Sequence, residues 1–152
     1  MKSKRIAAFI FARGGSRGLP NKNLMEVGGV SLLCRAITAA KTSKAVDEVF
    51  ISTDSEQIAE KAAEYGATIP FLRPRNLATD DSPEIESWRH AVNYIQTRAG
   101  WELEALVSVP TTCPFREHVD IDRCIAEYYA TQADLVVTIT GSARNPYFNM
   151  LR

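Results

Sequence analysis

The chain has 152 residues, 45% of them hydrophobic, which is enough for one domain with a sizeable buried core. Eighteen basic residues balance eighteen acidic ones, so net charge does not steer the protein to nucleic acid or to an anionic membrane surface. The three cysteines have neither metal-site spacing nor the density of a disulfide scaffold, and no signal peptide precedes the first expected strand. We therefore expect a cytoplasmic protein in which any anion site is local.

Predicted strands and helices alternate from the first residues onward. Residues 6–12, "IAAFIFA", predict a strand buried on both faces, and residues 49–52 predict a second strand. Between them, apolar residues at helical spacing predict a helix that Ser31 can cap: Leu32, Leu33, Ala36, Ile37 and Ala40. After the second strand, residues 53–55 offer three capping side chains to a helix that ends at Gly66.

The same alternation continues to residue 139. Residues 68–72 predict a short strand, and Ser82 before Pro83 predicts the cap of a helix with an apolar face of Ile85, Trp88, Val92 and Ile95. Residues 106–109 predict another buried strand, and residues 135–139 predict the last one. The helix expected between these two strands has an apolar face of Ile121, Cys124, Ile125 and Tyr128.

Alternating strands and helices are typical of a mostly parallel sheet, which right-handed crossovers make into an α/β, Rossmann-like three-layer sandwich. Ligands of such sheets bind beyond the carboxyl ends of the strands. Six cations follow predicted strands and should lie at that edge: Arg13, Arg17, Lys22, Arg73, Arg75 and Arg116. The sequence thus predicts a single domain over residues 1–152 that binds a small, highly charged anion.

The loop at residues 11–24, "FARGGSRGLPNKNL", has the composition of a phosphate-binding loop. Three glycines, Gly14, Gly15 and Gly18, allow positive φ angles and close backbone approach, so that amide groups can converge on phosphate oxygens. It is not a Walker A loop, because no Gly-Lys-Ser/Thr closes it, and Pro20 separates it from the dinucleotide-binding pattern. The alternative is a glycine-rich turn with solvated cations.

The segment "ARGGSRGLPNKNL" resembles the signature loop of the acylneuraminate cytidylyltransferases, the CMP-sialic acid synthetase family. Three later stretches also resemble segments of that family: "VFISTDSEQIAEKAAEYGA" with "FLRPRNLATDDSP", then "PTTCPFR", then "ARNPYFNM". The resemblance runs from Ile6 to Met150 and implies a fold of the nucleotide-diphospho-sugar transferase type.

The resemblance also implies a reaction, in which CMP passes from CTP to the anomeric hydroxyl of a nine-carbon, sialic-acid-like 2-keto sugar acid, releasing pyrophosphate with Mg²⁺. It implies that Arg13 and Lys22 are catalytic, and that eight residues bind the nucleotide: Ala12, Gly14, Gly15, Ser16, Asn23, Arg73, Thr111 and Thr112. It further implies a sugar site of Arg144, Tyr147 and Asn149, and a homodimer for the full-length form.

The sequence departs from the family pattern in two places. Pro110 stands where the family often has a glutamine, which leaves open a nucleotidyltransferase for another base or sugar. The family's magnesium-binding aspartates lie in a later segment, so we expect the chain to lack the family's C-terminal part, and its metal ligands are unknown. "VDID" at residues 119–122 is interpreted as the acidic start of a helix. A non-catalytic nucleotide-binding fragment is therefore a further alternative.

Overall fold

The computed structural model describes residues 3–15 and 18–139. The chain divides into two compact units, Met1–Asp122 and Arg123–Arg152. The sheet, the helices that cover it and the candidate site all belong to the first unit.

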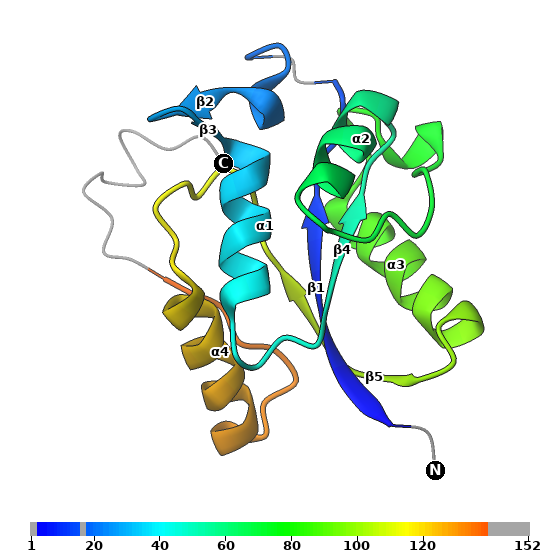
Figure 1. Cartoon of the computed structure of the whole chain (residues 1–152). Coiled ribbons are helices and arrows are strands. Elements are labelled where there is room, and N and C mark those ends of the chain that lie inside the picture. Colours follow the sequence, from blue (N-terminus) through cyan, green and yellow to red (C-terminus); the bar gives the residue numbers. More distant parts are fainter. Residues whose placement is uncertain (1–2, 16–17, 140–152) are drawn as a thin grey trace, which may run out of the picture. The chain divides into compact units, whose positions relative to one another are not determined.

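A parallel sheet of three strands forms the centre of the first unit, in the order β4, β1, β5 (Figure 1). These strands are β1 (Lys4–Phe11), β4 (Glu48–Ser52) and β5 (Glu102–Ser108). Phe9 of β1 pairs with Phe50 on one side and with Ser108 on the other. The predicted buried strand at residues 6–12 is confirmed, because β1 is central and fully covered over most of its length.

Helices cover both faces of this sheet, which confirms the Rossmann-like α/β class. The side chains of β1 alternate between the faces, as in any strand. One set packs with α3 (Glu84–Arg98) in a cluster of Ala7, Phe9, Phe50, Ala91 and Ile95. The opposite face is covered by α1 (Leu32–Thr42), which also contacts α2 (Glu56–Glu64).

Serine caps fix the starts of the first two long helices. The Oγ of Ser31 accepts a hydrogen bond from the backbone N–H of Cys34 at 3.2 Å, which confirms the predicted cap of α1. Among the three candidate caps of α2, Ser55 is the one used, and its Oγ accepts from the Ile58 N–H at 3.4 Å. Gly66 follows α2 with a φ of 71°. A residue in the left-handed region is what ends a helix sharply, so this position favours glycine.

The predicted cap of α3 is wrong. Pro83 is the cap residue of this helix, and no side chain caps it. The Ser82 hydroxyl instead donates to the carbonyl of Asn76 at 2.6 Å, within the turn that follows the short 3₁₀ helix η2 (Arg75–Leu77). Ile85 is 45% exposed, and the buried side of α3 is formed by Ser87, Ala91 and Ile95.

Two predicted strands are also wrong. Residues 68–72 form only isolated bridges, from Thr68 to Phe50 and from Leu72 to Thr53. Residues 135–139 have no strand pairing with any part of the chain that the structure describes, and Leu135 is 69% exposed. A short apolar run becomes a strand only when a neighbouring backbone pairs with it, and the sequence pattern does not specify that neighbour.

A small hairpin that the sequence analysis did not predict follows the opening loop. It consists of β2 (Glu26–Val27) and β3 (Val30–Ser31), joined by two glycines with positive φ. The 3₁₀ helix η1 (Lys22–Leu24) precedes it. Together, η1 and the hairpin connect the opening loop to α1 and fix the backbone position of Lys22.

The last helix, α4 (His118–Thr131), begins in the first unit and confirms the helix predicted there. Asp120 lies in its first turn and accepts a hydrogen bond from the Glu117 N–H at 3.0 Å. Asp122 accepts from the hydroxyl of Ser43 at 2.6 Å, and this hydrogen bond is the main cause that lowers the pKa of Asp122. Among the described helices, none is both long and apolar enough to cross a membrane.

Candidate functional site

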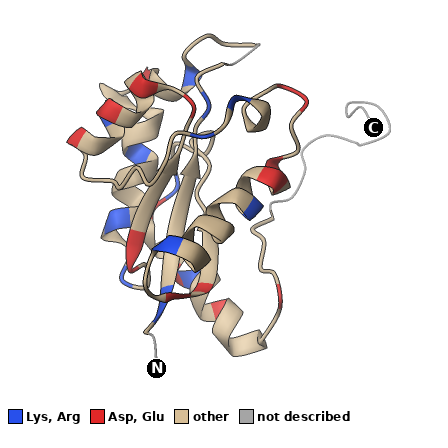
Figure 2. Cartoon of the chain, turned by 90° about the vertical axis from the view of Figure 1, so that its right-hand side faces the viewer, with Lys and Arg blue, Asp and Glu red and all other residues tan. Residues whose placement is uncertain are grey.

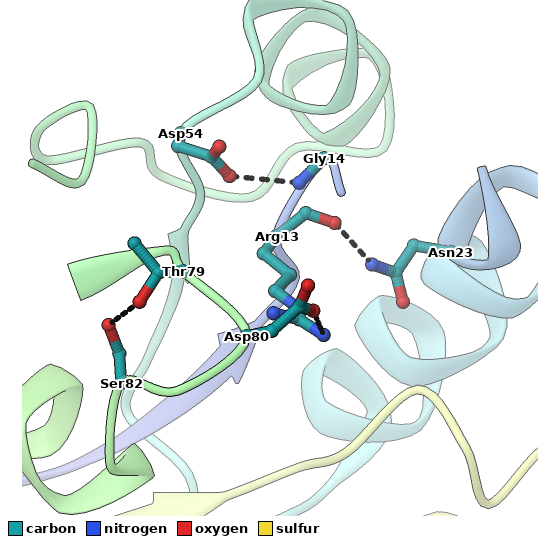
Figure 3. Close-up of polar contacts among 7 residues, drawn as sticks. All are labelled: Arg13, Gly14, Asn23, Asp54, Thr79, Asp80 and Ser82. Atoms are coloured by element: carbon teal, nitrogen blue, oxygen red, sulfur yellow. Dashed lines mark hydrogen bonds and ion pairs between the residues drawn. The ribbon is translucent and has the colours of Figure 1, made fainter. Parts of the chain in front are cut away.

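A cleft of about 340 Å³ opens at the carboxyl ends of β1 and β5. Six of the residues predicted from the sequence to bind or activate the nucleotide line it: Arg13, Lys22, Asn23, Arg73, Thr111 and Thr112. They come from three loops that are far apart in the sequence and that the parallel sheet brings to one edge. The cleft is therefore the candidate ligand site (Figure 3).

Arg13 leaves the sheet immediately after β1. The residue before it, Ala12, is fully buried, and its N–H donates to the Ser52 carbonyl at 3.0 Å, which extends the sheet pairing by one residue. The Nη2 of Arg13 lies 2.6 Å from Oδ1 of Asp80. Arg13 thus reaches the cleft from a rigid backbone position, and its guanidinium forms an ion pair there (Figure 3).

Asn23 joins the opening loop to the loop after β5. It is 5% exposed; its Nδ2 donates to the Arg13 carbonyl at 2.9 Å, and its Oδ1 accepts from the Thr111 hydroxyl at 2.7 Å. A backbone carbonyl can only accept, so the amide must present its NH₂ to Arg13 and its oxygen to Thr111. The hydroxyl of Thr111 must then be the donor in the second bond.

The glycines of the opening loop behave differently from the prediction. Neither Gly14 nor Gly15 has a positive φ. Gly14 is confined by space, because a Cβ there would lie 3.0 Å from the Cβ of Ser55, whereas nothing lies within 4 Å of a Cβ at Gly15. The Gly14 N–H donates to Oδ1 of Asp54 at 2.8 Å, so this amide already binds a carboxylate oxygen (Figure 3).

Arg73 forms part of the wall of the cleft and is only 7% exposed. Its Nε donates to Oγ of Ser52 at 3.0 Å, its Nη2 donates to the Ser52 carbonyl, and its guanidinium lies 5.7 Å from the ring centre of Phe11. Burial lowers the pKa of Arg73, while the nearby carboxylates of Asp54 and Glu84 act in the opposite direction. The side chain is therefore held by the sheet edge.

The remaining predicted residues fall in two groups. Arg75 and Arg116 do not line the cleft in the part of the chain that the structure describes, and Arg116 instead donates to the Pro110 carbonyl at 3.1 Å. The expectation that the six cations share one site is therefore not met by these two. The others lie outside the described residues: Ser16, Arg17, Arg144, Tyr147 and Asn149.

The sequence analysis missed one whole wall of the cleft. The segment between Arg73 and the first turns of α3 contributes Leu77, Thr79, Asp80, Ser82, Glu84 and Ser87. The stretch "FLRPRNLATDDSP" contained the signal, but the sequence analysis assigned only its two arginines to the ligand site. No regular periodicity marks this segment, since it is a loop whose position depends on the sheet edge.

The charges in the cleft favour an anion only modestly. Three cations line it, Arg13, Lys22 and Arg73, against two carboxylates, Asp80 and Glu84. Elsewhere in the chain acidic and basic positions are interspersed over helices and loops (Figure 2). Among residues 3–15 and 18–139, no group of three or more His, Cys, Asp or Glu side chains is placed to hold a metal ion.

The family model described as Cytidylyltransferase matches residues 7–148. The chain belongs to this cytidylyltransferase family. The match includes all three loops that line the cleft, from Phe11 to Thr112.

Two proteins that are similar to this chain come from bacteria. Post-translational flagellin modification protein B of Campylobacter coli is 34% identical over 146 residues, which cover 96% of this chain and 62% of that protein. CMP-N,N'-diacetyllegionaminic acid synthase of Legionella pneumophila is 36% identical over 142 residues, covering 93% of this chain and 60% of that protein. The chain thus spans about three fifths of the length of these relatives.

A solved structure shows the same fold. A CMP:2-keto-3-deoxy-manno-octonic acid synthetase complexed with CTP superposes with a TM-score of 0.66 at 20% sequence identity. The superposition covers 85% of this chain and 49% of that one. The α/β sandwich fold is thereby confirmed.

Proposed function

We propose that this chain carries the nucleotide site of an enzyme that transfers CMP from CTP to the anomeric hydroxyl of a nine-carbon 2-keto sugar acid. The observation that carries the proposal is the cleft at the sheet edge, where Arg13, Lys22 and Arg73 meet. Family membership supports cytidine as the nucleoside, and the name of the Legionella relative supports a sugar acid of the legionaminic type as the acceptor.

In the proposed reaction the anomeric oxygen forms a bond to the α-phosphorus of CTP. The bond from that phosphorus to the oxygen bridging to the β-phosphorus breaks, the hydroxyl proton is released, and pyrophosphate leaves. Negative charge builds up on the phosphoryl oxygens and the leaving group, so fixed cations stabilise the transition state more than the substrate. Arg13 and Lys22 are the residues to which we assign this role.

The nucleoside part of the proposal involves the neutral walls of the cleft. Thr111 and Thr112 follow β5, and the backbone of this loop offers hydrogen-bonding groups to a base. Pro110 also lines the cleft, where its ring provides no N–H donor. Pro110 therefore leaves open one alternative, a nucleotidyltransferase that accepts another base or sugar.

The family resemblance adds three further parts to the proposal: a Mg²⁺ ion, a sugar site and a homodimer. A Mg²⁺ ion commonly binds nucleotide phosphates and water with only one or two protein carboxylates. The described residues offer no group of three such ligands, and we propose that the phosphates of CTP would supply ligands to a bound Mg²⁺. We assign the sugar site to Arg144, Tyr147 and Asn149, and we expect the cytoplasm as the location.

The test of the proposed function is release of pyrophosphate when the chain is mixed with CTP, Mg²⁺ and one of several nine-carbon 2-keto sugar acids. We expect release with at least one acid, and a loss of about a hundredfold or more in Arg13→Ala and in Lys22→Ala. Arg75→Ala is the matched control, because Arg75 is an exposed cation outside the cleft. Binding of CTP without any release would instead establish a non-catalytic nucleotide-binding fragment.

A further inference from the structure

Arg13 forms an ion pair with a carboxylate of the same cleft. Its Nη2 lies 2.6 Å from Oδ1 of Asp80, and the two side chains are 32% and 28% exposed. Both residues line the cleft beside Lys22. A phosphate group binds a guanidinium best through two parallel N–H bonds, and two anions on one guanidinium repel each other. Asp80 and a phosphate therefore compete for Arg13.

The turn that carries Asp80 is held by its own hydrogen bonds. The hydroxyls of Thr79 and Ser82 lie 2.6 Å apart (Figure 3). The Ser82 hydroxyl also donates to the Asn76 carbonyl at 2.6 Å. Aspartate has a short side chain, so the backbone of the turn decides how far its carboxylate reaches. The pair with Arg13 is thus a feature of the folded turn, not a chance contact of two flexible side chains.

We propose that Asp80 is an internal counter-ion of Arg13, which the phosphates displace when they bind and which pairs with Arg13 again when pyrophosphate leaves. This inference rests on the proposed function, because it takes the anion of the cleft to be a polyphosphate. Asp80 sets the affinity of the cleft for phosphates without touching the reacting atoms. The exchange of one anion for another on Arg13 favours product release.

The proposal is tested by whether Asp80→Asn binds pyrophosphate more tightly or more weakly than wild type. Inorganic pyrophosphate is titrated by calorimetry into the wild-type chain, Asp80→Asn and Asp81→Asn. We expect Asp80→Asn to bind about tenfold more tightly, because it loses both the competing carboxylate and one repelling charge. Asp81→Asn should stay within about twofold, since Asp81 is exposed and does not line the cleft. Unchanged or weaker binding to Asp80→Asn would overturn the proposal and make Asp80 a support that orients Arg13.

A double-mutant cycle separates the specific pair from the general field of the carboxylate. In an Arg13→Ala background, Asp80→Asn should tighten pyrophosphate binding by no more than about threefold, because the competition for the Arg13 guanidinium is already absent. A full tenfold gain without Arg13 would contradict an ion-pair exchange. Far-ultraviolet circular dichroism checks that each variant is folded, so that the changes in pyrophosphate affinity are measured on folded protein.

The outcome for CTP distinguishes this proposal from the proposed function. Selective binding of CTP together with an unaltered pyrophosphate affinity in Asp80→Asn would overturn the counter-ion role alone. If neither CTP nor pyrophosphate binds to any variant, the polyphosphate site itself is contradicted.

Discussion

The guanidinium of Arg73 is anchored to Ser52, the last residue of β4. Its Nε donates to the Ser52 Oγ at 3.0 Å in a buried contact between residues 21 positions apart. One wall of the cleft is thereby fixed to the central sheet. The ring of Phe11, at the end of β1, lies against the same guanidinium.

Substitution of Ser52 should weaken both the fold and the cleft. Ser52→Ala leaves a buried charged donor without one of its acceptors, which costs about 1.5–3 kcal/mol of unfolding free energy. Arg73→Ala should cost at least as much, whereas Arg75→Ala should change stability by about 0.5 kcal/mol or less, because Arg75 is exposed. Denaturant unfolding measures all three. Equal stability of wild type and Ser52→Ala would show that the contact contributes nothing.

The hydrogen bond from Thr111 to Asn23 should matter for both folding and nucleotide binding. Thr111→Val keeps the side-chain shape but leaves the buried Oδ1 of Asn23 unpaired, at a cost of about 1–3 kcal/mol. We expect a shift of the Arg13 backbone and about a tenfold loss of CTP affinity. Thr111→Ser retains the hydroxyl and should keep most of the wild-type affinity for CTP. If both variants bind CTP equally, the hydroxyl does not position the opening loop.

The two glycines after Arg13 should respond differently to alanine. A Cβ at Gly14 would meet the Cβ of Ser55 at 3.0 Å, and Ser55 is held as the cap of α2, so the loop must move. We expect Gly14→Ala to lower the free energy of unfolding by about 1–3 kcal/mol. Gly15→Ala meets no atom within 4 Å and should stay within about 0.5 kcal/mol of wild type. Thermal and denaturant unfolding measure the stability of the two variants. A Gly15→Ala variant less stable than Gly14→Ala would contradict the close packing of Gly14 against Ser55.

His90 should make stability depend on pH near neutrality. Its Nδ1 is buried without a hydrogen-bond partner among the residues that the structure describes, and its ring lies edge-on to Phe71 with the ring centres 4.3 Å apart. Burial, and then the charge of Arg73, lowers the pKa of His90 from the usual 6.5. The unfolded chain therefore takes up a proton more readily than the folded one. Stability due to His90 is fully present above pH 6.5 and is lost as the pH falls through the lower folded value.

His90→Phe removes the titrating group and keeps a ring of similar shape against Phe71. From pH 8 down to about 5, the unfolding free energy of wild type should fall relative to that of His90→Phe, which lacks the titrating group. Parallel curves over this range would show that His90 is as easily protonated in the folded state as in the unfolded one.

Periodicity predicted most of the sheet and its helices because these elements depend on local apolar patterns. The run at residues 6–12 became β1, and the capped helices after Ser31 and Ser55 are α1 and α2. The errors occur where a distant partner decides the outcome. Residues 68–72 pair at only two points, and the Ser82 hydroxyl bonds within a turn instead of capping α3.

The candidate site was predicted in part for the same reason. Arg13 and Lys22 follow β1, and Arg73 follows a segment that was predicted as a strand but forms only isolated bridges. The rule that parallel strands end at one edge nevertheless predicted that these three cations lie together. Asp80 lies in a loop of irregular structure, so neither spacing nor composition indicated its contact with Arg13. The confinement of Gly14 likewise depends on Ser55, which is distant in sequence. The hairpin was also not predicted, although the Gly28–Gly29 pair at its turn is a recognisable two-residue hairpin signal.

The central claim is that the cleft binds CTP through Arg13. Calorimetric titration of the chain with CTP, UTP, ATP and GTP in Mg²⁺, together with Arg13→Ala and Arg75→Ala, tests it most directly. We predict that CTP binds at least about tenfold more tightly than the other nucleotides, that Arg13→Ala loses this binding by about a hundredfold, and that Arg75→Ala retains it. Equal affinity for all four nucleotides, or CTP binding that Arg13→Ala leaves intact, would contradict the account.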